Sequence, residues 1–261
     1  MVNRTIHLIW NALLLLAFFV RAGLINATTK DPERRRKRLV ASMNRFCKKF
    51  RRALGLKITV NGADILRSMK SEKYLLVANH VSYLDVIILG HLEQLVFITS
   101  VEMGEDGVMG PITRNGGCLF TDRKKFVSLP DEIQRFARCV SAGNKVVLFP
   151  EGTSTNGDTV QAFKGSLFQV AVPAEAPVLP VCVRYITIDG KPLDTGNRDT
   201  AFWYGDMTFM PHFLKLMGRK IEIEVNILPP VMYDKSRNRG QLSDIVHGML
   251  LKCYTSYPPI S

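Results

Sequence analysis

The chain has 261 residues, of which 46% are apolar, and this length suits one α/β domain with a short additional segment. That composition excludes a disordered or fibrous protein. The net charge of +12 is confined to residues 1–60, which carry 14 Lys or Arg and two acidic residues, so the body of the chain is neutral. A nucleic-acid binder would carry its positive charge on the folded body, so this class is excluded as well.

The first element is an apolar segment from Ile6 to Val20, with an unbroken apolar run over residues 12–20. At about 1.5 Å per residue this segment is short for a bilayer core of roughly 30 Å, so it would insert obliquely or lie in the interface. A cleaved signal peptide is the alternative, but such peptides carry their positive charge before the apolar run. Here one arginine precedes the run and seven basic residues up to position 38 follow it. This pattern favours the cytoplasmic face of a membrane, and a bacterial inner membrane is the expected location.

A basic amphipathic helix is predicted next. Leu39, Met43, Phe46, Phe50 and Leu54 recur at steps of four and three and form one apolar stripe, while basic side chains fill much of the rest. The helix either packs on the following domain with a solvated charged face or contacts anionic lipids. The apolar run before it favours the lipid contact.

From Lys57 onward, short apolar strands alternate with helical segments. The alternation predicts an α/β fold with a mostly parallel sheet flanked by helices, and Asp189-Gly190 predicts a turn. Residues 191–220 show no interpretable pattern. Strands are expected at Ile58–Val60, Tyr74–Ala78, Leu95–Thr99, Cys118–Thr121, Lys145–Phe149, Val178–Arg184 and Ile221–Ile227, and helices at Tyr83–His91, Asp131–Ser141, Leu167–Val172 and Ser243–Tyr254.

The cysteines are expected to be reduced thiols in a protein that faces the cytosol. Their number is odd, and no two of them have the spacing of metal ligands, so neither a disulfide framework nor a metal site is predicted. They are Cys47, Cys118, Cys139, Cys182 and Cys253.

The segment Asn79–Asp85 (NHVSYLD) lies where a predicted strand gives way to a helix. His80 would follow the carboxyl end of the strand, where open α/β sheets bind ligands. With Ser82 as N-cap, Asp85 lies one turn into the helix and can turn back to accept a hydrogen bond from the His80 ring. Such a bond fixes the tautomer, so His80 could remove a proton from a hydroxyl at neutral pH. A capping box formed by Ser82 and Asp85 is an equally good interpretation of the spacing, but it gives no reason for Asn79-His80.

Three further segments carry candidate binding residues. The segment 116–123 (GGCLFTDR) ends in a cationic cluster, where Arg123 could bind a phosphate or carboxylate. The segment 146–153 (VVLFPEGT) exposes Glu151 at the same sheet edge as His80, and Gly152 would allow close approach to the backbone. Taken alone, each is better explained as an ordinary turn. The segment 176–181 (APVLPV) is better explained as a structural wall.

In this order, NHVSYLD, GGCLFTDR, FPEGT and PVLPV resemble the four sequence blocks of the glycerolipid acyltransferase family, which includes the 1-acyl-sn-glycerol-3-phosphate acyltransferases. The blocks lie within residues 79–181, about 40% of the chain, and Phe163-Lys164-Gly165 matches a further family feature. The resemblance implies a glycerol-3-phosphate acyltransferase-like α/β domain over residues 57–261, preceded by membrane-associated helices within residues 1–56.

The resemblance also assigns roles to residues. It implies His80 as general base and Asp85 as the carboxylate that orients it, a pair with the spacing HxxxxD. Val178, Leu179 and Pro180 would belong to the acyl-donor pocket. Acyl-CoA or acyl-carrier protein would be the donor, and the family needs neither metal nor cofactor. The acceptor lipid would be bound by Arg123, near its phosphate, and by Glu151, Gly152, Thr153 and Lys164.

One position departs from the family pattern. Many members that acylate lysophosphatidate carry Arg or Lys directly after FPEGT, whereas this chain has Ser154. A lyso-ornithine lipid or another lysophospholipid is therefore an alternative acceptor. Because Arg123 and Lys164 could supply the missing charge, 1-acyl-sn-glycerol 3-phosphate, which would yield phosphatidate, remains the first expectation.

Direct transfer is the expected mechanism, because the chain has no G-x-S-x-G elbow and no cysteine adjoins His80 in the sequence. A non-catalytic membrane lipid-binding module on the same scaffold is the alternative from another class. Such a module would not need a base beside a carboxylate. The sequence does not indicate the oligomeric state.

Overall fold

The computed structural model describes residues 4–122, 129–236 and 238–260. A mixed sheet with the strand order β1-β8-β6-β2-β5-β3-β4 forms its centre, and β7 pairs with β6. The run from β6 to β4 is parallel, and the antiparallel pair β6/β8 joins it to the parallel pair β8/β1. The mostly parallel sheet is therefore confirmed. The strands are β1 (Leu56–Asn61), β2 (Leu75–Ala78), β3 (Leu95–Ser100), β4 (Leu119–Thr121), β5 (Lys145–Leu148), β6 (Val178–Ile188), β7 (Lys191–Pro192) and β8 (Ile221–Ile227).

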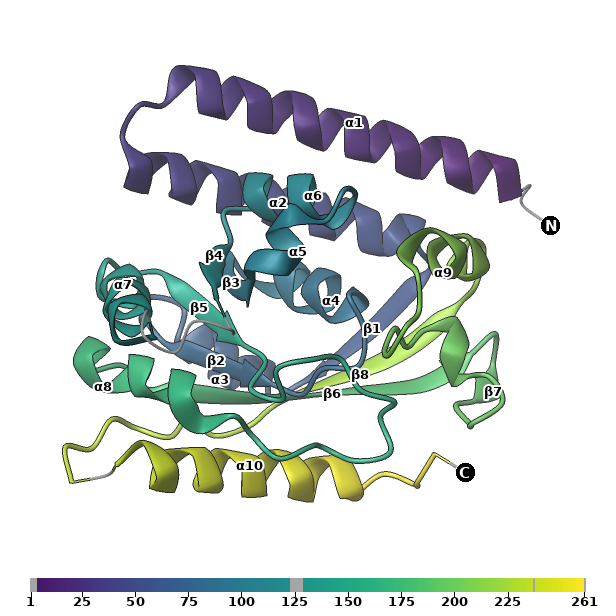
Figure 1. Cartoon of the computed structure of the whole chain (residues 1–261). Helices are drawn as coiled ribbons and strands as arrows, with labels where there is room; N and C mark the ends of the chain where they lie inside the picture. Colours follow the sequence, from purple (N-terminus) through teal and green to yellow (C-terminus); the bar gives the residue numbers. More distant parts are fainter. Residues whose placement is uncertain (1–3, 123–128, 237, 261) are drawn as a thin grey trace.

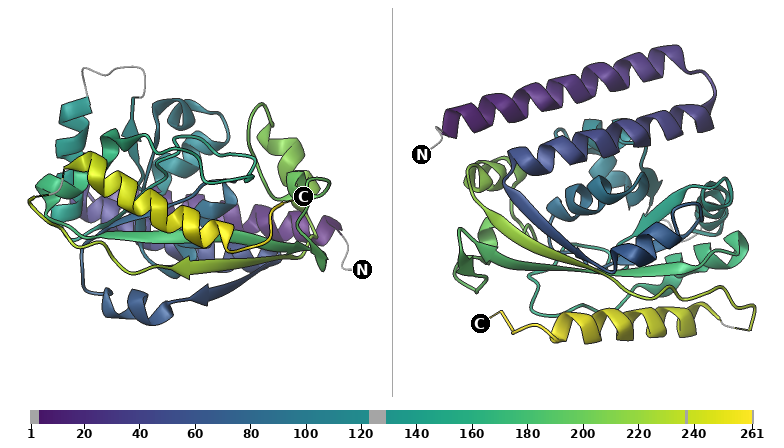
Figure 2. Two further views of the ribbon diagram at one scale, coloured as in Figure 1. Left: turned by 90° about the horizontal axis from the view of Figure 1, so that it is seen from below. Right: turned by 180° about the vertical axis from the view of Figure 1, so that it is seen from behind.

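Helices cover both faces of the sheet (Figures 1 and 2). One core contains side chains from α2 (Pro32–Ala53), α4 (Leu84–Leu92) and α9 (Phe209–Leu216). The other contains side chains from α7 (Leu129–Ser141) and α10 (Arg239–Thr255), with the 3-10 turn Gly165–Val170 in contact with both. The remaining helices are α1 (Arg4–Thr28), α3 (Ala63–Ser68), α5 (Val101–Glu105), α6 (Met109–Asn115), α8 (Ala171–Ala174) and the 3-10 turns Gly165–Val170 and Arg198–Thr200.

The central strands are apolar along their whole length because both faces are buried. Successive side chains of a strand point to opposite faces, so Leu75 and Val77 of β2 enter the core under α7 and α10, while Leu76 and Ala78 enter the core under α2 and α4. This is the pattern expected of a parallel sheet with helices on both sides.

The amphipathic helix α2 packs on the domain. Its apolar stripe is buried, with Met43, Phe46 and Phe50 in the core beneath it, and Asp31 caps its first turn through the Arg34 N–H at 2.7 Å. The stripe thus faces protein, so the outward basic side chains are the part of α2 that could meet anionic lipids, and that contact stays a prediction. The basic side chains occupy much of the outward surface.

The apolar segment forms a longer helix than the expected run. The helix α1 continues to Thr28, and its residues Thr5–Thr28 are long and apolar enough to cross a membrane. It lies along the outside of α2 as the second arm of a helical hairpin (Figure 1), and the Phe18 ring packs against Phe46 at 5.0 Å between centroids.

The predicted turn at Asp189-Gly190 is confirmed. It joins β6 to β7, and both residues have positive φ, 53° and 79°. Such angles are those of a two-residue hairpin turn, and Asp and Gly adopt them more readily than other residues do.

Candidate active site

The loops that follow β2 and β5 meet at one edge of the sheet. The two strands are parallel neighbours, so the residues after Ala78 and after Leu148 emerge side by side. Asn79 anchors the first loop to β6: its side-chain amide donates to the Val183 carbonyl at 2.9 Å, and its side-chain oxygen accepts from the Val183 N–H at 2.8 Å. These two hydrogen bonds, one donated and one accepted by the Asn79 side chain, explain why an asparagine precedes His80.

The predicted hydrogen bond between His80 and Asp85 is present. His80 Nδ1 lies 2.9 Å from Asp85 Oδ2, and the carboxylate is fully buried while the imidazole is 18% exposed. Asp85 Oδ2 also accepts from the N–H groups of Val81 and Ser82, at 2.8 and 3.0 Å. The same carboxylate thus contacts the histidine and binds the backbone of the loop before α4, while the N-cap of the helix is Tyr83 and not the predicted Ser82.

Tyr185 of β6 completes the environment of Asp85 and was not predicted from the sequence. Its hydroxyl donates to Asp85 Oδ1 at 2.8 Å, and burial holds its pKa well above the ordinary value, so the hydroxyl keeps its proton. With donors on both oxygens, Asp85 acts as an acceptor toward His80. The imidazole then carries its proton on Nδ1 and leaves the lone pair of Nε2 to act as a base.

The second loop holds the His80 backbone and ring. The His80 ring stacks on Phe149 at 4.1 Å between centroids, with 16° between the planes. The His80 N–H donates to Glu151 Oε1 at 2.6 Å, and the His80 carbonyl accepts from the Thr155 N–H at 3.0 Å. The loop after β5 thus fixes both the peptide and the imidazole of His80.

Glu151 lies at the predicted sheet edge but is buried and not exposed as expected, because both carboxylate oxygens accept backbone hydrogen bonds. Its second oxygen accepts from the Gln161 N–H at 2.9 Å. Burial raises the pKa of Glu151 to about 7 and the nearby charge of Asp85 adds to this effect, while the hydrogen bonds from Gln161 and His80 oppose it. These contacts make Glu151 a tether between two loops, and its role in acceptor binding stays a prediction.

Gly152 and Lys164 lie against each other beside Glu151. Gly152 has φ +79°, and a Cβ built there would be 2.9 Å from both Cδ and Nζ of Lys164. The Lys164 N–H donates to the Pro150 carbonyl at 2.8 Å, which brings the exposed ammonium to this part of the loop. Thr153 is exposed next to them. Arg123 lies outside the described residues.

The three residues assigned to the acyl-donor pocket lie deep in the sheet. Val178 faces α10 and lines a small cavity there, whereas the side chain of Leu179 enters the opposite core. Pro180 is buried and pairs with Val77 in the register of β2 and β6. Because neighbouring strand residues face opposite sides, Val178 and Leu179 do not line one shared pocket in this structure. Their role in donor binding stays a prediction.

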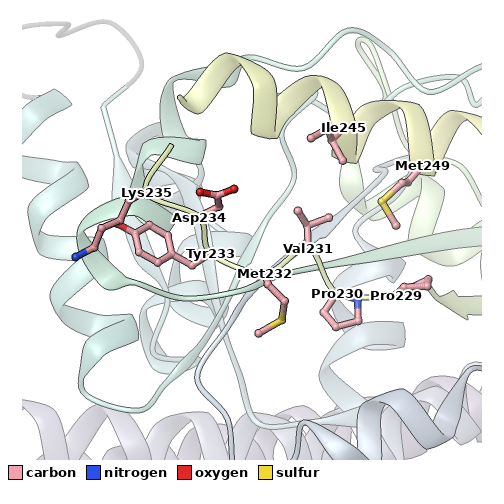
Figure 3. A pocket seen from close by; sticks show the side chains of 9 residues that line it. All are labelled: Pro229, Pro230, Val231, Met232, Tyr233, Asp234, Lys235, Ile245 and Met249. Atoms are coloured by element: carbon pink, nitrogen blue, oxygen red, sulfur yellow. The ribbon is translucent and has the colours of Figure 1, made fainter. Parts of the chain in front are cut away.

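An open groove of about 780 Å³ lies elsewhere, between the loop after β8 and α10 (Figure 3). Val231 pairs with Val178 at the start of β6, so this groove is at the sheet edge opposite His80. Its lining residues are Pro229, Pro230, Val231, Met232, Tyr233, Asp234, Lys235, Ile245 and Met249.

Residues 191–220 showed no interpretable sequence pattern, and part of this stretch covers the loop that follows β2. The Trp203 N–H donates to the Val81 carbonyl at 2.9 Å, and the Tyr83 hydroxyl lies 3.0 Å from Nδ1 of His212. The rings of Trp203, Phe209 and His212 all meet the Tyr83 ring edge to face. These contacts join residues far apart in the sequence, so no local pattern could have indicated them.

A histidine at the edge of an α/β sheet, hydrogen-bonded to a buried aspartate five residues later, is an arrangement that can serve as a general base. The family model for acyltransferases matches residues 57–184, and an acyltransferase is 31% identical over 74% of this chain and 68% of its own length, so the chain belongs to the acyltransferase family.

Several characterised proteins are similar to the chain. A lyso-ornithine lipid O-acyltransferase from Rhizobium meliloti is 31% identical over 74% of this chain and 68% of the relative. A 1-acyl-sn-glycerol-3-phosphate acyltransferase from Neisseria gonorrhoeae is 28% identical over 65% of each chain. The matched regions thus span about two thirds of these relatives. The crystal structure of a 1-acyl-sn-glycerophosphate acyltransferase from Thermotoga maritima has the same fold, with TM-score 0.62 and 21% identity over 96% of this chain and 97% of that one.

Proposed function

We propose that the protein transfers a fatty acyl group from a thioester to a free hydroxyl of a lysolipid. The supporting observation is the hydrogen bond between His80 and Asp85 in this chain, which belongs to the acyltransferase family. The bond fixes the imidazole at the sheet edge and leaves Nε2 as the basic nitrogen. In this mechanism Nε2 takes the proton of the acceptor hydroxyl while its oxygen attacks the thioester carbonyl. Collapse of the tetrahedral intermediate breaks the carbon–sulfur bond, and the leaving thiolate takes the proton from His80. The new ester and the free thiol are the products.

The proposed acceptor is a lyso-ornithine lipid. Two features support it: relatives that are 31% and 32% identical over 74% and 69% of this chain are lyso-ornithine lipid O-acyltransferases, and Ser154 stands where many lysophosphatidate-acylating members carry a cation. A second candidate is 1-acyl-sn-glycerol 3-phosphate, which the Lys164 ammonium beside Gly152 favours. For that acceptor Arg123 remains the proposed phosphate ligand.

Acyl-CoA or acyl-carrier protein is the proposed donor. The chemistry needs a base and an activated carbonyl, which His80 and the thioester supply, so the proposed reaction requires neither metal nor cofactor.

The proposed place of action is the cytoplasmic surface of a membrane. Seven large apolar side chains of α1 are more than half exposed, which suits contact with lipid: Ile6, Ile9, Trp10, Leu13, Leu16, Val20 and Leu24. The outward basic side chains of α2 suit an anionic leaflet.

One acceptor panel tests the function. The purified full chain is incubated with acyl-CoA or acyl-carrier protein and either lysolipid, and thiol release and the acylated lipid are both measured. We expect transfer to lyso-ornithine lipid above that to 1-acyl-sn-glycerol 3-phosphate. If neither lipid gives turnover above a His80→Ala background with either donor, the non-catalytic lipid-binding module is the better account.

A further inference from the structure

Exposed apolar side chains are concentrated on two helices. Of the twelve large hydrophobic side chains that are exposed among the described residues, seven lie on α1 and two on α9, and the other three are Val108, Met232 and Ile245. The two on α9 are Met210 and Leu214, 49% and 39% exposed and one turn apart. Side chains four residues apart lie on the same face of a helix, so they form one apolar strip.

The helix α9 is a neighbour of the amino-terminal half of α1 (Figure 1). Asn11 of α1 donates to the sulfur of Met217, the residue that follows α9, at 3.5 Å. Phe213 of α9 also stacks on Phe50 of α2 at 6.3 Å between centroids. The helix α9 is thus adjacent to the helix that carries most of the exposed apolar surface.

The two faces of α9 differ sharply. The inner face buries His212, Phe213 and Leu216, whereas the outer face presents the strip formed by Met210 and Leu214. Three cations follow the strip, Lys215, Arg219 and Lys220, and the sequence from residue 209 to 220 holds no acidic residue. Two of these cations bind residues outside α9. Lys215 donates to the Asp199 carbonyl at 3.2 Å, and Arg219 forms an ion pair with Asp189 at 2.8 Å.

The inner face of α9 contacts the loop that carries His80. His212 reaches the Tyr83 hydroxyl at 3.0 Å, and Phe209 packs on the Tyr83 ring at 5.1 Å. Tyr83 lies between His80 and Asp85, so α9 connects the molecular surface to the proposed catalytic loop.

We propose that the outer face of α9 docks on an anionic lipid surface as a second membrane contact beside α1. A short apolar strip followed by cations suits a helix that lies in the headgroup region, with apolar side chains inserted and cations near lipid phosphates. Contact at α9 brings the loop of His80 to the level where lysolipid hydroxyl groups lie. The inference rests on the proposed action at a membrane, but its readouts do not depend on acyl transfer.

Hydrogen exchange of the full chain tests the contact directly. Exchange is measured by mass spectrometry with and without vesicles of phosphatidylethanolamine and phosphatidylglycerol. We expect peptides covering residues 209–220 to exchange several-fold more slowly with vesicles, while the groove loop 229–235 at the opposite edge is unchanged. Equal exchange of residues 209–220 in both conditions would overturn the proposal.

A pair of double variants extends the test to function. Met210→Gln with Leu214→Gln removes the strip, and Met232→Gln with Ile245→Gln removes two other exposed apolar side chains, 63% and 40% exposed, at the distant groove. The α9 variant should show a several-fold higher apparent KM for lysolipid in vesicles, unchanged kinetics with a monomeric short-chain lysolipid, and lost protection of residues 209–220. The groove variant should match the unsubstituted chain in all three. If both variants behave alike, α9 has no special contact with lipid, whichever acceptor the enzyme uses.

Discussion

The imidazole of His80 has one nitrogen committed to a buried acceptor and the other available as a base. Asp85 holds Nδ1 at 2.9 Å, and Phe149 covers one ring face. His80→Ala should therefore lower kcat by about 10²- to 10⁴-fold, the range for loss of a general base. Thiol release measures the effect and circular dichroism checks the fold. His91→Ala, a histidine change at the other end of α4, serves as the control and should retain activity. Near-normal turnover of the His80→Ala protein would remove His80 from the mechanism.

Tyr185 binds Asp85 and does not touch His80, so its effect on catalysis would be indirect. Tyr185→Phe removes the donor to Asp85 Oδ1 and leaves a buried charged acceptor less satisfied. We expect kcat to fall several-fold and the free energy of unfolding to fall by about 1–3 kcal/mol. Tyr254→Phe is the matched control, because its hydroxyl donates to the Gly157 carbonyl at 2.6 Å and makes no contact with Asp85. It should lose comparable stability with a smaller change in kcat. An equal loss of kcat in both variants would assign Tyr185 a purely structural role.

Glu151 predicts a pH dependence of stability. Burial raises its pKa to about 7 in the folded chain, against 4.5 as its ordinary value. The folded state therefore keeps this proton to higher pH than the unfolded chain. Its contribution to the free energy of unfolding is full below pH 4.5 and is lost as the pH rises through 7, by roughly 3 kcal/mol in total. Denaturant titrations measure the unfolding free energy of the unsubstituted chain minus that of Glu151→Gln. This difference should fall as the pH rises from 4.5 through 7. A difference that is independent of pH would contradict the raised pKa.

The residues of the site were predictable where the signal was local. His80 and Asp85 are five residues apart on a strand-to-helix loop, and Glu151 follows a neighbouring parallel strand, so topology alone brings them together. Tyr185 and His212 were missed because their contacts depend on how β6 and α9 pack, which short sequence patterns do not specify. The residue types alone gave no signal for either of them.

At the scale of elements, the seven predicted strands are all present. The central strands are continuous apolar runs, typical of a sheet covered on both faces, whereas β1 and β8 alternate apolar and polar residues. The missed helices α3, α5, α6 and α9 have eight residues or fewer, too short for a helical periodicity to stand out. The stripe of α2 was identified correctly, but amphipathicity alone does not distinguish a protein partner from a lipid one.

The loop after β5 gives a test of one element. Gly152→Ala adds a Cβ at a φ of +79° and only 2.9 Å from the Lys164 side chain. We expect a loss of about 1–2 kcal/mol from the positive φ, together with a several-fold higher KM for the acceptor, because Lys164 must move. Gly143→Ala is the control: φ is +85° with nothing within 4 Å of the new Cβ, in the turn before β5 at the other sheet edge. The Gly143→Ala variant should lose similar stability and keep its KM for the acceptor. A raised KM in both variants would mean that the effect does not come from Lys164.

At the scale of the whole molecule, the contacts of α1 restrict how it can meet a bilayer. The helix touches α2 from end to end: His7 reaches the Ala53 carbonyl at 3.3 Å, Phe18 packs on Phe46, and Thr29 just after α1 is hydrogen-bonded by Arg38. If α1 crossed the membrane in this arrangement, α2 would cross with it. Its exposed cations would then enter hydrocarbon: Arg34, Lys37, Arg38, Arg45, Lys48, Lys49 and Arg52.

Each such cation costs about 2.5–3.5 kcal/mol near the bilayer centre, so several together exceed what the apolar face of α1 can offset. We therefore expect α1 to lie in the plane of the interface, although its length is sufficient to cross. Cysteines introduced as Thr5→Cys and Ala27→Cys, near the two ends of α1, should react with a membrane-impermeant maleimide from the same side of sealed vesicles. The unsubstituted chain gives the background from its own thiols. Labelling of the two ends from opposite sides would mean that the hairpin opens and α1 crosses the membrane alone.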